Sequence, residues 1–123
     1  FTGWVENVGD YLAAFDMFVL PSLREGFGSI LVDAMQFGLP IVASSVGGIP
    51  DIIEHGKNGF LVTPGDECEL ADAIVHLYTD AGMRDAMSTA ALRRAKDYRP
   101  EKMIECYWNL YREILPALAD QES

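Results

Sequence analysis

Two short, continuously apolar runs separated by roughly the length of one helix constrain this chain more than any other feature of its sequence. The first run covers residues 17–20 and is closed by Pro21, and the second covers residues 41–43. Runs without polar alternation are typical of strands that are buried on both faces of a parallel sheet. Since crossovers between parallel strands are right-handed and are usually helical, the segment between the runs predicts a strand–helix–strand unit. The expected fold class is therefore α/β.

Helical periodicity and turn residues place the other elements of the first half. A helix is expected over residues 7–15, with Asn7 as its cap, and a second one over residues 28–37. A short helix over residues 51–54 and a third strand over residues 60–62 complete the alternation. This order of elements favours a Rossmann-like parallel sheet.

The second half, residues 65–123, shows helical patterns only. Asp66 and Glu69 have the spacing of a capping box ahead of an apolar stripe, and a further helix is expected over residues 83–91. A third helix begins at Pro100, and we expect its apolar face to pack in a core or between domains. That face comprises Met103, Ile104, Tyr107, Trp108, Tyr111, Ile114, Leu115 and Leu118. We interpret residues 1–123 as a single partial domain, with strand–helix alternation over residues 1–64 and a helical tail after it.

Composition excludes several classes of function. A chain of 123 residues is one domain at most, and its net charge of −10 argues against a nucleic-acid partner. No apolar run approaches the roughly 18 residues of a membrane helix, and no signal-peptide pattern opens the chain. Cys68 and Cys106 lie far apart without the spacing of a metal site. A reducing, cytoplasmic location without a metal is therefore expected.

The segment that follows the first apolar run contains the candidate site residues. Glu25 and Asp33 stand eight positions apart, and Gly26 and Gly28 come just after the first acid. In an open α/β sheet, ligands bind beside such a turn, at the carboxyl end of a strand. Glycines let the backbone approach a ligand, a helix start offers N–H groups to an anion, and ionised carboxylates accept hydrogen bonds from hydroxyls. The expected ligand therefore carries both a phosphate and several hydroxyl groups, as a nucleotide sugar does.

An ordered series of motifs spans nearly the whole chain. They are Gly3-Trp-Val5, Phe18-Val-Leu-Pro-Ser22, Glu25-Gly-Phe-Gly28, Asp33-Ala-Met35, Gly38-Leu-Pro40, Val46-Gly-Gly-Ile-Pro50, Gly56-Lys-Asn-Gly59, Leu61-Val62 and Pro64-Gly-Asp66. With these motifs the chain resembles the C-terminal, donor-binding domain of GT-B-fold retaining glycosyltransferases of the family 4, group 1 type. The resemblance implies transfer of a sugar from a nucleotide diphosphate donor to a hydroxyl acceptor, with retention.

The same resemblance implies roles for individual residues. The family signature is Glu, seven residues, Glu, and here Glu25 and Asp33 occupy the two acid positions. Glu25 would be the catalytic residue that accepts hydrogen bonds from the hydroxyls of the donor sugar. Asp33 would hold the ribose after a small shift or through a water, because it is one methylene shorter than glutamate; alternatively, it complements the dipole of the helix start. The implied donor-binding set is Glu25, Gly26, Phe27, Gly28, Ser29, Ile30 and Asp33.

The resemblance also implies parts that lie outside this chain. An acceptor-binding domain, which would also make any peripheral membrane contact, and the basic residues that neutralise the diphosphate would lie upstream. The isolated chain is then expected to be inactive, with the nucleotide sugar as co-substrate and no other cofactor. Residues 1–3 are expected to be a strand remnant. We expect the open edge of the strand at residues 17–20 either to drive self-association or to be covered by residues 1–3.

Other interpretations remain open at this point. A nucleotide-sugar epimerase of GT-B architecture would share the fold. A flavodoxin-like receiver or a plain nucleotide-binding module would need no transfer chemistry, but a receiver needs acidic residues where Pro21-Ser22 and Ser44-Ser45 follow the apolar runs. Gly47 and Gly48 are equally compatible with loop geometry and with ligand contact.

Overall fold

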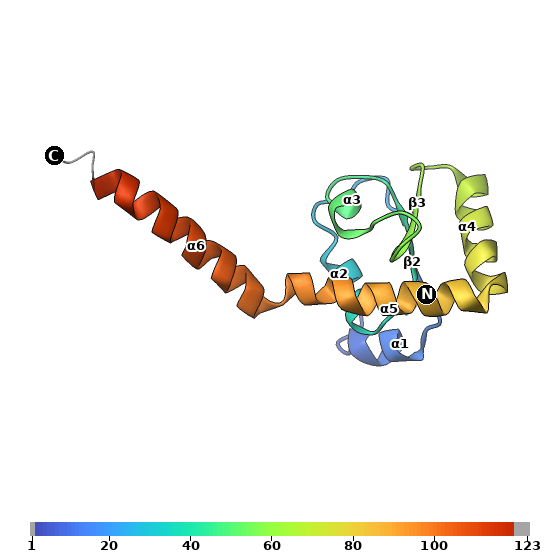
Figure 1. The fold of residues 1–123 in the computed structure, drawn as a ribbon. Helices are drawn as coiled ribbons and strands as arrows, with labels where there is room; N and C mark the ends of the chain where they lie inside the picture. Colours follow the sequence, from blue (N-terminus) through green and yellow to red (C-terminus); the bar gives the residue numbers. More distant parts are fainter. Residues whose placement is uncertain (1, 120–123) are drawn as a thin grey trace.

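The core of the protein is a small parallel sheet covered by helices (Figure 1). The computed structural model describes residues 2–119, with side chains described through residue 115. Strands β1 (Phe18–Leu20), β2 (Ile41–Ser44) and β3 (Gly59–Val62) are all parallel and lie in the order β1-β2-β3. The predicted α/β fold class with its parallel sheet is confirmed.

Helices alternate with the strands in the first half and follow one another in the second. They are α1 (Val8–Ala14), α2 (Ser29–Gln36), α3 (Ile49–Ile52), α4 (Glu67–Thr79), α5 (Ala81–Ala95), the 3-10 turn η1 (Lys96–Tyr98) and α6 (Pro100–Ala119). Two predicted boundaries were wrong. Helix α3 begins at Ile49 rather than at residue 51, because Pro50 lies inside its first turn. Helix α5 is longer than expected at both ends; it begins earlier because the Asp80 carboxylate accepts a hydrogen bond from the Met83 N–H (2.9 Å) and caps it.

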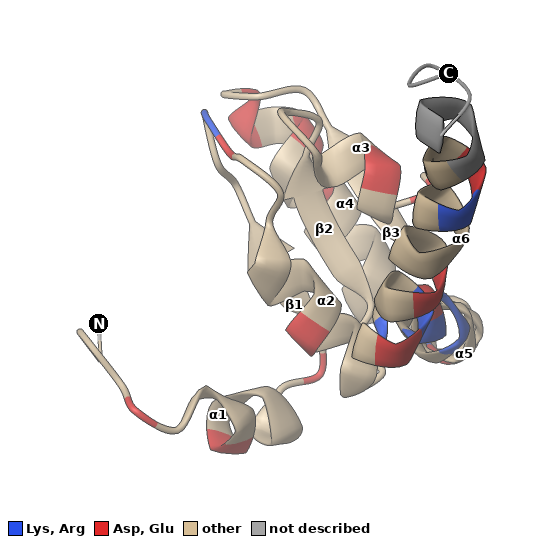
Figure 2. Ribbon diagram, turned by 90° about the vertical axis from the view of Figure 1, so that its left-hand side faces the viewer, with Lys and Arg blue, Asp and Glu red and all other residues tan. Residues whose placement is uncertain are grey.

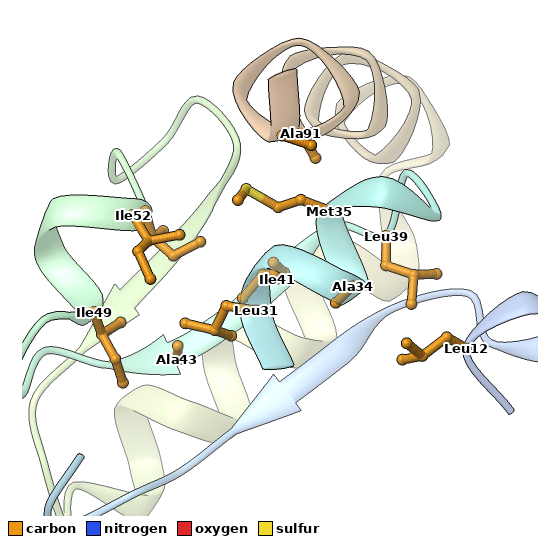
Figure 3. Close-up of a cluster of buried hydrophobic side chains, with 12 residues drawn as sticks. Leu12, Leu31, Ala34, Met35, Leu39, Ile41, Ala43, Ile49, Ile52 and Ala91 are labelled. Carbon is orange, nitrogen blue, oxygen red and sulfur yellow. The ribbon is translucent and has the colours of Figure 1, made fainter. Parts of the chain in front are cut away.

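Strand β2 is the centre of the core. Its Ile41 and Ala43 face one cluster of buried side chains, and the intervening Val42 faces another. The first cluster lies between β2, α2 and α3, where Leu31 and Ile52 are completely buried (Figure 3). The second lies between the other face of the sheet and α4. The prediction that this strand is buried on both faces is confirmed.

Strand β1 is less buried than its apolar sequence predicts. All three of its residues are only half-buried. The physical reason is position, since β1 lies at the end of the sheet and has no strand partner on its outer side among the described residues. Thr2 and Gly3 form no strand, and Figure 2 shows the N-terminal segment leading away from the sheet. The predicted strand remnant is therefore wrong at these two residues, and Phe1 lies outside the described residues.

The outer edge of β3 is covered by the turn that precedes it. The Gly56 N–H donates to the Gly59 carbonyl (2.8 Å), and the Leu61 N–H donates to His55 Nδ1 (3.1 Å). These bonds satisfy polar groups that an open edge would offer to another strand. The two edges of the sheet therefore differ in their capacity to pair.

Helices α5 and α6 leave the sheet in different ways. Helix α5 contributes Met87 to the second cluster and Ala91 to the first, and Figure 1 shows it running across below the strands. Helix α6 extends away from the body, and its Trp108 and Tyr111 are 59% and 58% exposed. Its apolar face is therefore no core of this chain, whereas interdomain packing stays a prediction; Leu118 lies outside the residues whose side chains are described. No described helix is long and apolar enough to cross a membrane.

Candidate functional site

The loop between β1 and α2 holds Glu25 at the carboxyl end of the sheet. Glu25 is half-buried, and its carboxylate accepts hydrogen bonds from Ser22 Oγ and from the Gly26 N–H, both at 3.2 Å. Both contacts are long, and an ionised carboxylate offers about four acceptor positions. Glu25 therefore keeps acceptor capacity for the hydroxyl groups of a ligand.

Directly after this loop, α2 begins without a side-chain cap. Gly28 occupies the cap position with a left-handed φ of +77°, and its carbonyl accepts the first helical bond, from the Leu31 N–H (2.9 Å). Ser29 and Ile30 are the first two helical residues, so their N–H groups have no acceptor one turn earlier in the helix. Such N–H groups are suited to an anion.

The remaining predicted site residues have different surroundings. Asp33 is exposed and is the fifth residue of α2. It therefore lies beyond the first turn, and the helix dipole acts mainly within that first turn. The dipole interpretation is therefore disfavoured, and ribose binding stays a prediction. Phe27 is 54% exposed, and its ring packs beside that of Tyr98 with the centroids 5.9 Å apart and the planes tilted by 59°. Glu25 to Ile30 thus form one contiguous group, and Asp33 lies one turn further along.

A cavity of about 400 Å³ lies beside this loop and was not predicted from the sequence. Pro21, Ser44 and Val62, at the ends of the three strands, line it together with residues of the β3–α4 turn and the start of α4, among them Thr63, Asp66 and Leu70. The rule that ligands bind at the carboxyl ends of parallel strands could have found it, because residues 63–66 follow the third strand. The cavity therefore lies at the same end of the sheet as the β1–α2 loop.

The predicted capping box beside this cavity is half right. The Asp66 carboxylate accepts from the Glu69 N–H (2.9 Å), as expected. The Glu69 carboxylate, however, accepts from the Thr63 N–H (2.7 Å) and not from the N–H of Asp66, which donates to the Thr63 carbonyl. The box therefore also ties the β3–α4 turn to the helix.

Positive charge is concentrated on α5, η1 and the start of α6, outside the β1–α2 loop itself. Figure 2 shows the blue ribbon of basic residues mainly around α5. The basic residues of α5, η1 and the start of α6 are Arg84, Arg93, Arg94, Lys96, Arg99 and Lys102. Lys102, with help from Arg94, holds the pKa of Asp97 below its usual value, and Lys57 does the same for Glu54. The loop itself has one cation, Arg24. Within residues 2–119 no group of His, Cys, Asp and Glu side chains could hold a metal ion.

Comparison with known proteins assigns the chain to a family. Residues 1–80 match the family model described as glycosyl transferases group 1. The chain belongs to this family. N-acetyl-alpha-D-glucosaminyl L-malate synthase of Bacillus anthracis is 35% identical to this group 1 glycosyltransferase chain over 116 residues, which cover 94% of the chain and 30% of that protein. D-inositol 3-phosphate glycosyltransferase of Corynebacterium jeikeium is 38% identical over 91% of the chain and 26% of its own length.

Solved structures show the same fold. The Anabaena protein HepE, solved with UDP, superposes with a TM-score of 0.76 at 31% identity, over 98% of this chain and 32% of HepE. These neighbours are GT-B glycosyltransferases, which confirms the resemblance and the Rossmann-like fold, and favours neither the epimerase nor the receiver interpretation. The group 1 chain spans only about a third of the length of these relatives.

Proposed function

We propose that the protein carrying this chain transfers a sugar from a nucleotide diphosphate donor to a hydroxyl acceptor, with retention, and that this chain supplies part of the donor site. One observation carries the proposal: the carboxylate of the half-buried Glu25 lies beside the uncapped start of α2, at the carboxyl end of the sheet. Family membership supports it, and so does HepE, which was solved with UDP-glucose.

Each group of the site has a role that follows from its chemistry. Glu25 accepts hydrogen bonds from sugar hydroxyls and so orients the anomeric carbon toward the acceptor. The N–H groups of Ser29 and Ile30 stabilise the negative charge that grows on the leaving diphosphate, without reorganising as the bond breaks. Gly26, Phe27 and Gly28 line the approach to the sugar. Asp33 accepts from the ribose hydroxyls, directly or through a water.

The remaining parts of the reaction are proposed to lie outside these residues. The chain spans about a third of its relatives, and the acceptor site and most of the positive charge for the diphosphate belong to the remainder. The net charge of −10 opposes an anionic ligand. The isolated chain is therefore proposed to transfer no sugar and to bind nucleotide sugars with a dissociation constant near the millimolar range, about −4 kcal/mol.

The test is Glu25→Gln in the full-length protein, with Glu25→Ala as a second variant. Loss of a charged hydrogen bond worth roughly 1.5–3 kcal/mol predicts at least about a tenfold fall in kcat/KM for transfer. Asp85→Asn, at an exposed acid on α5, is the matched control and should transfer normally. Proton NMR of the product reports whether the anomeric configuration is retained. Kinetics of the Glu25→Gln variant equal to those of the control would exclude Glu25 from the site.

A further inference from the structure

Gly47 and Gly48 press against the backbone of the Glu25 loop. A Cβ atom on Gly47 would lie 1.9 Å from the Glu25 carbonyl oxygen, and one on Gly48 would lie 2.9 Å from the Gly26 carbonyl oxygen and 3.2 Å from Phe27 Cα. The Gly48 N–H also donates to the Gly26 carbonyl at 2.8 Å. The space that a side chain would need at these two positions is thus filled by the loop itself.

Helix α3 holds the two glycines in place. Gly48 is the cap residue of α3, whose Ile49 and Ile52 are completely buried in the first core cluster (Figure 3). At the other end of α3, the Asp51 carbonyl accepts from Arg94 Nη2 (2.6 Å) and from the Tyr98 hydroxyl (3.0 Å). A short helix with its end carbonyls satisfied and its apolar face buried is a firm support.

The Glu25 carboxylate itself has little to hold it in place. Its own hydrogen bonds, to Ser22 and Gly26, are both 3.2 Å long and both come from the same loop. Its position therefore depends on where the loop backbone lies, and the contact with Gly47 and Gly48 determines that. A displacement of a binding group by about 1 Å can cost on the order of a hundredfold in rate.

We propose that Gly47 and Gly48 are positioning residues that clamp the Glu25 loop and thereby set the geometry of the sugar-donor site. This inference rests on the proposed function of Glu25. The backbone contacts of the two glycines favour loop geometry, one of the two interpretations that the sequence leaves open. Substitution of either glycine pushes the loop away from α3 and moves Glu25 with it.

Matched alanine variants of the full-length protein test the clamp. Gly48 has a φ of −81°, so Gly48→Ala introduces only the steric conflict; Gly82→Ala, at an ordinary φ with its nearest atom at 3.5 Å, is its control. Gly47 has a left-handed φ of +54°, so Gly47→Ala adds backbone strain. Gly56→Ala, at a φ of +79° with no atom within 4 Å, has comparable strain without the conflict.

The expected result is a change confined to the sugar donor. Gly47→Ala and Gly48→Ala should raise the KM for the nucleotide sugar by about tenfold or more, because the Glu25 loop is displaced by about 1 Å. The KM for the acceptor should stay within about twofold. Both controls should match the unmutated protein. In a Glu25→Gln background, Gly48→Ala should add less than about a further twofold, since it acts through Glu25.

Three outcomes would overturn the clamp: kinetics of Gly48→Ala equal to those of Gly82→Ala, a full additional loss in the Glu25→Gln background, or equal losses for both substrates.

Hydrogen exchange, which needs no activity, separates this inference from the proposed function. In the unmutated protein the Gly48 amide should exchange slowly, and the loop amides of residues 22–28 should exchange faster in Gly48→Ala but not in Gly82→Ala. Rapid exchange at Gly48 refutes the clamp even where the variants fail to fold. Slow exchange in a protein that transfers no sugar refutes only the proposed function.

Discussion

Asn58 is a buried amide that joins three elements of the core, and its replacement should be costly. Asn58 is only 2% exposed. Its Oδ1 accepts from the Glu54 N–H (2.7 Å), and its Nδ2 donates to the Ile52 carbonyl (3.2 Å) and contacts Met35 Sδ (3.4 Å). It thus holds the end of α3 against β3 and α2.

The magnitude of the loss follows from the groups left behind. In Asn58→Ala the Glu54 N–H loses its acceptor, whereas the Ile52 carbonyl keeps a 3.4 Å contact with Arg94 Nε. A fully buried polar group without a partner costs about 1–3 kcal/mol, and the part-buried Glu54 N–H should cost toward the lower end of that range. With the small void beside Met35, the expected destabilisation is about 2–3 kcal/mol in total.

Asn58→Asp separates the hydrogen bonds from the volume, because aspartate has nearly the same shape. The carboxylate still accepts from Glu54, but it faces the Ile52 carbonyl where an N–H group used to donate. Burial raises the pKa of such a carboxyl above its unfolded value. The folded state of this variant then binds more protons, so its stability should rise as pH falls toward about 4, where the unfolded carboxyl also takes up its proton.

Two measurements check this prediction. Urea unfolding reports the loss of free energy, and hydrogen exchange at the Glu54 amide should accelerate by at least about tenfold, which corresponds to 1.4 kcal/mol. Lys57→Ala is the control at the neighbouring position, because the Lys57 side chain is 73% exposed and its solvent-screened ion pair with Glu54 contributes little to stability. The reasoning is refuted if Asn58→Ala costs no more than Lys57→Ala.

Three further predictions concern other parts of the chain. Asp33→Asn should weaken nucleoside diphosphate binding in calorimetric titration and Asp33→Glu should keep or improve it; equal affinities in all three proteins would remove Asp33 from the site. Lys102 lowers the pKa of the exposed Asp97, so the tie between η1 and α6 should be intact above the unfolded pKa of about 4 and weaken as pH falls through the lower folded value. Circular dichroism of Asp97→Asn should show a flatter acid dependence of helicity than the unmutated chain. The isolated chain should self-associate through the outer edge of β1, and a clean monomer in light scattering at high concentration would contradict this.

Local patterns determined the order and type of the elements. Apolar runs without alternation, the glycine–proline turns and the Asp66 cap each act over a few residues, so the sequence alone predicts them. The carboxylate and glycines after β1 could be placed at the carboxyl end of a parallel sheet for the same reason, because strand, turn and helix follow one another in the chain. The group 1 motifs were visible in the same way.

Only the tertiary structure decided how distant segments meet. The sequence presents Asn58 as an ordinary turn residue, yet the turn folds beneath α2 and buries its amide. The sequence shows Gly47 and Gly48 only as two glycines of a turn. The structure shows that they contact the loop that holds Glu25, more than twenty positions earlier in the chain. The apolar residues of β1 and of α6 have the same composition as a core, but burial depends on what packs against them. Contacts of this kind join residues far apart in the chain, and a local pattern has no information about them.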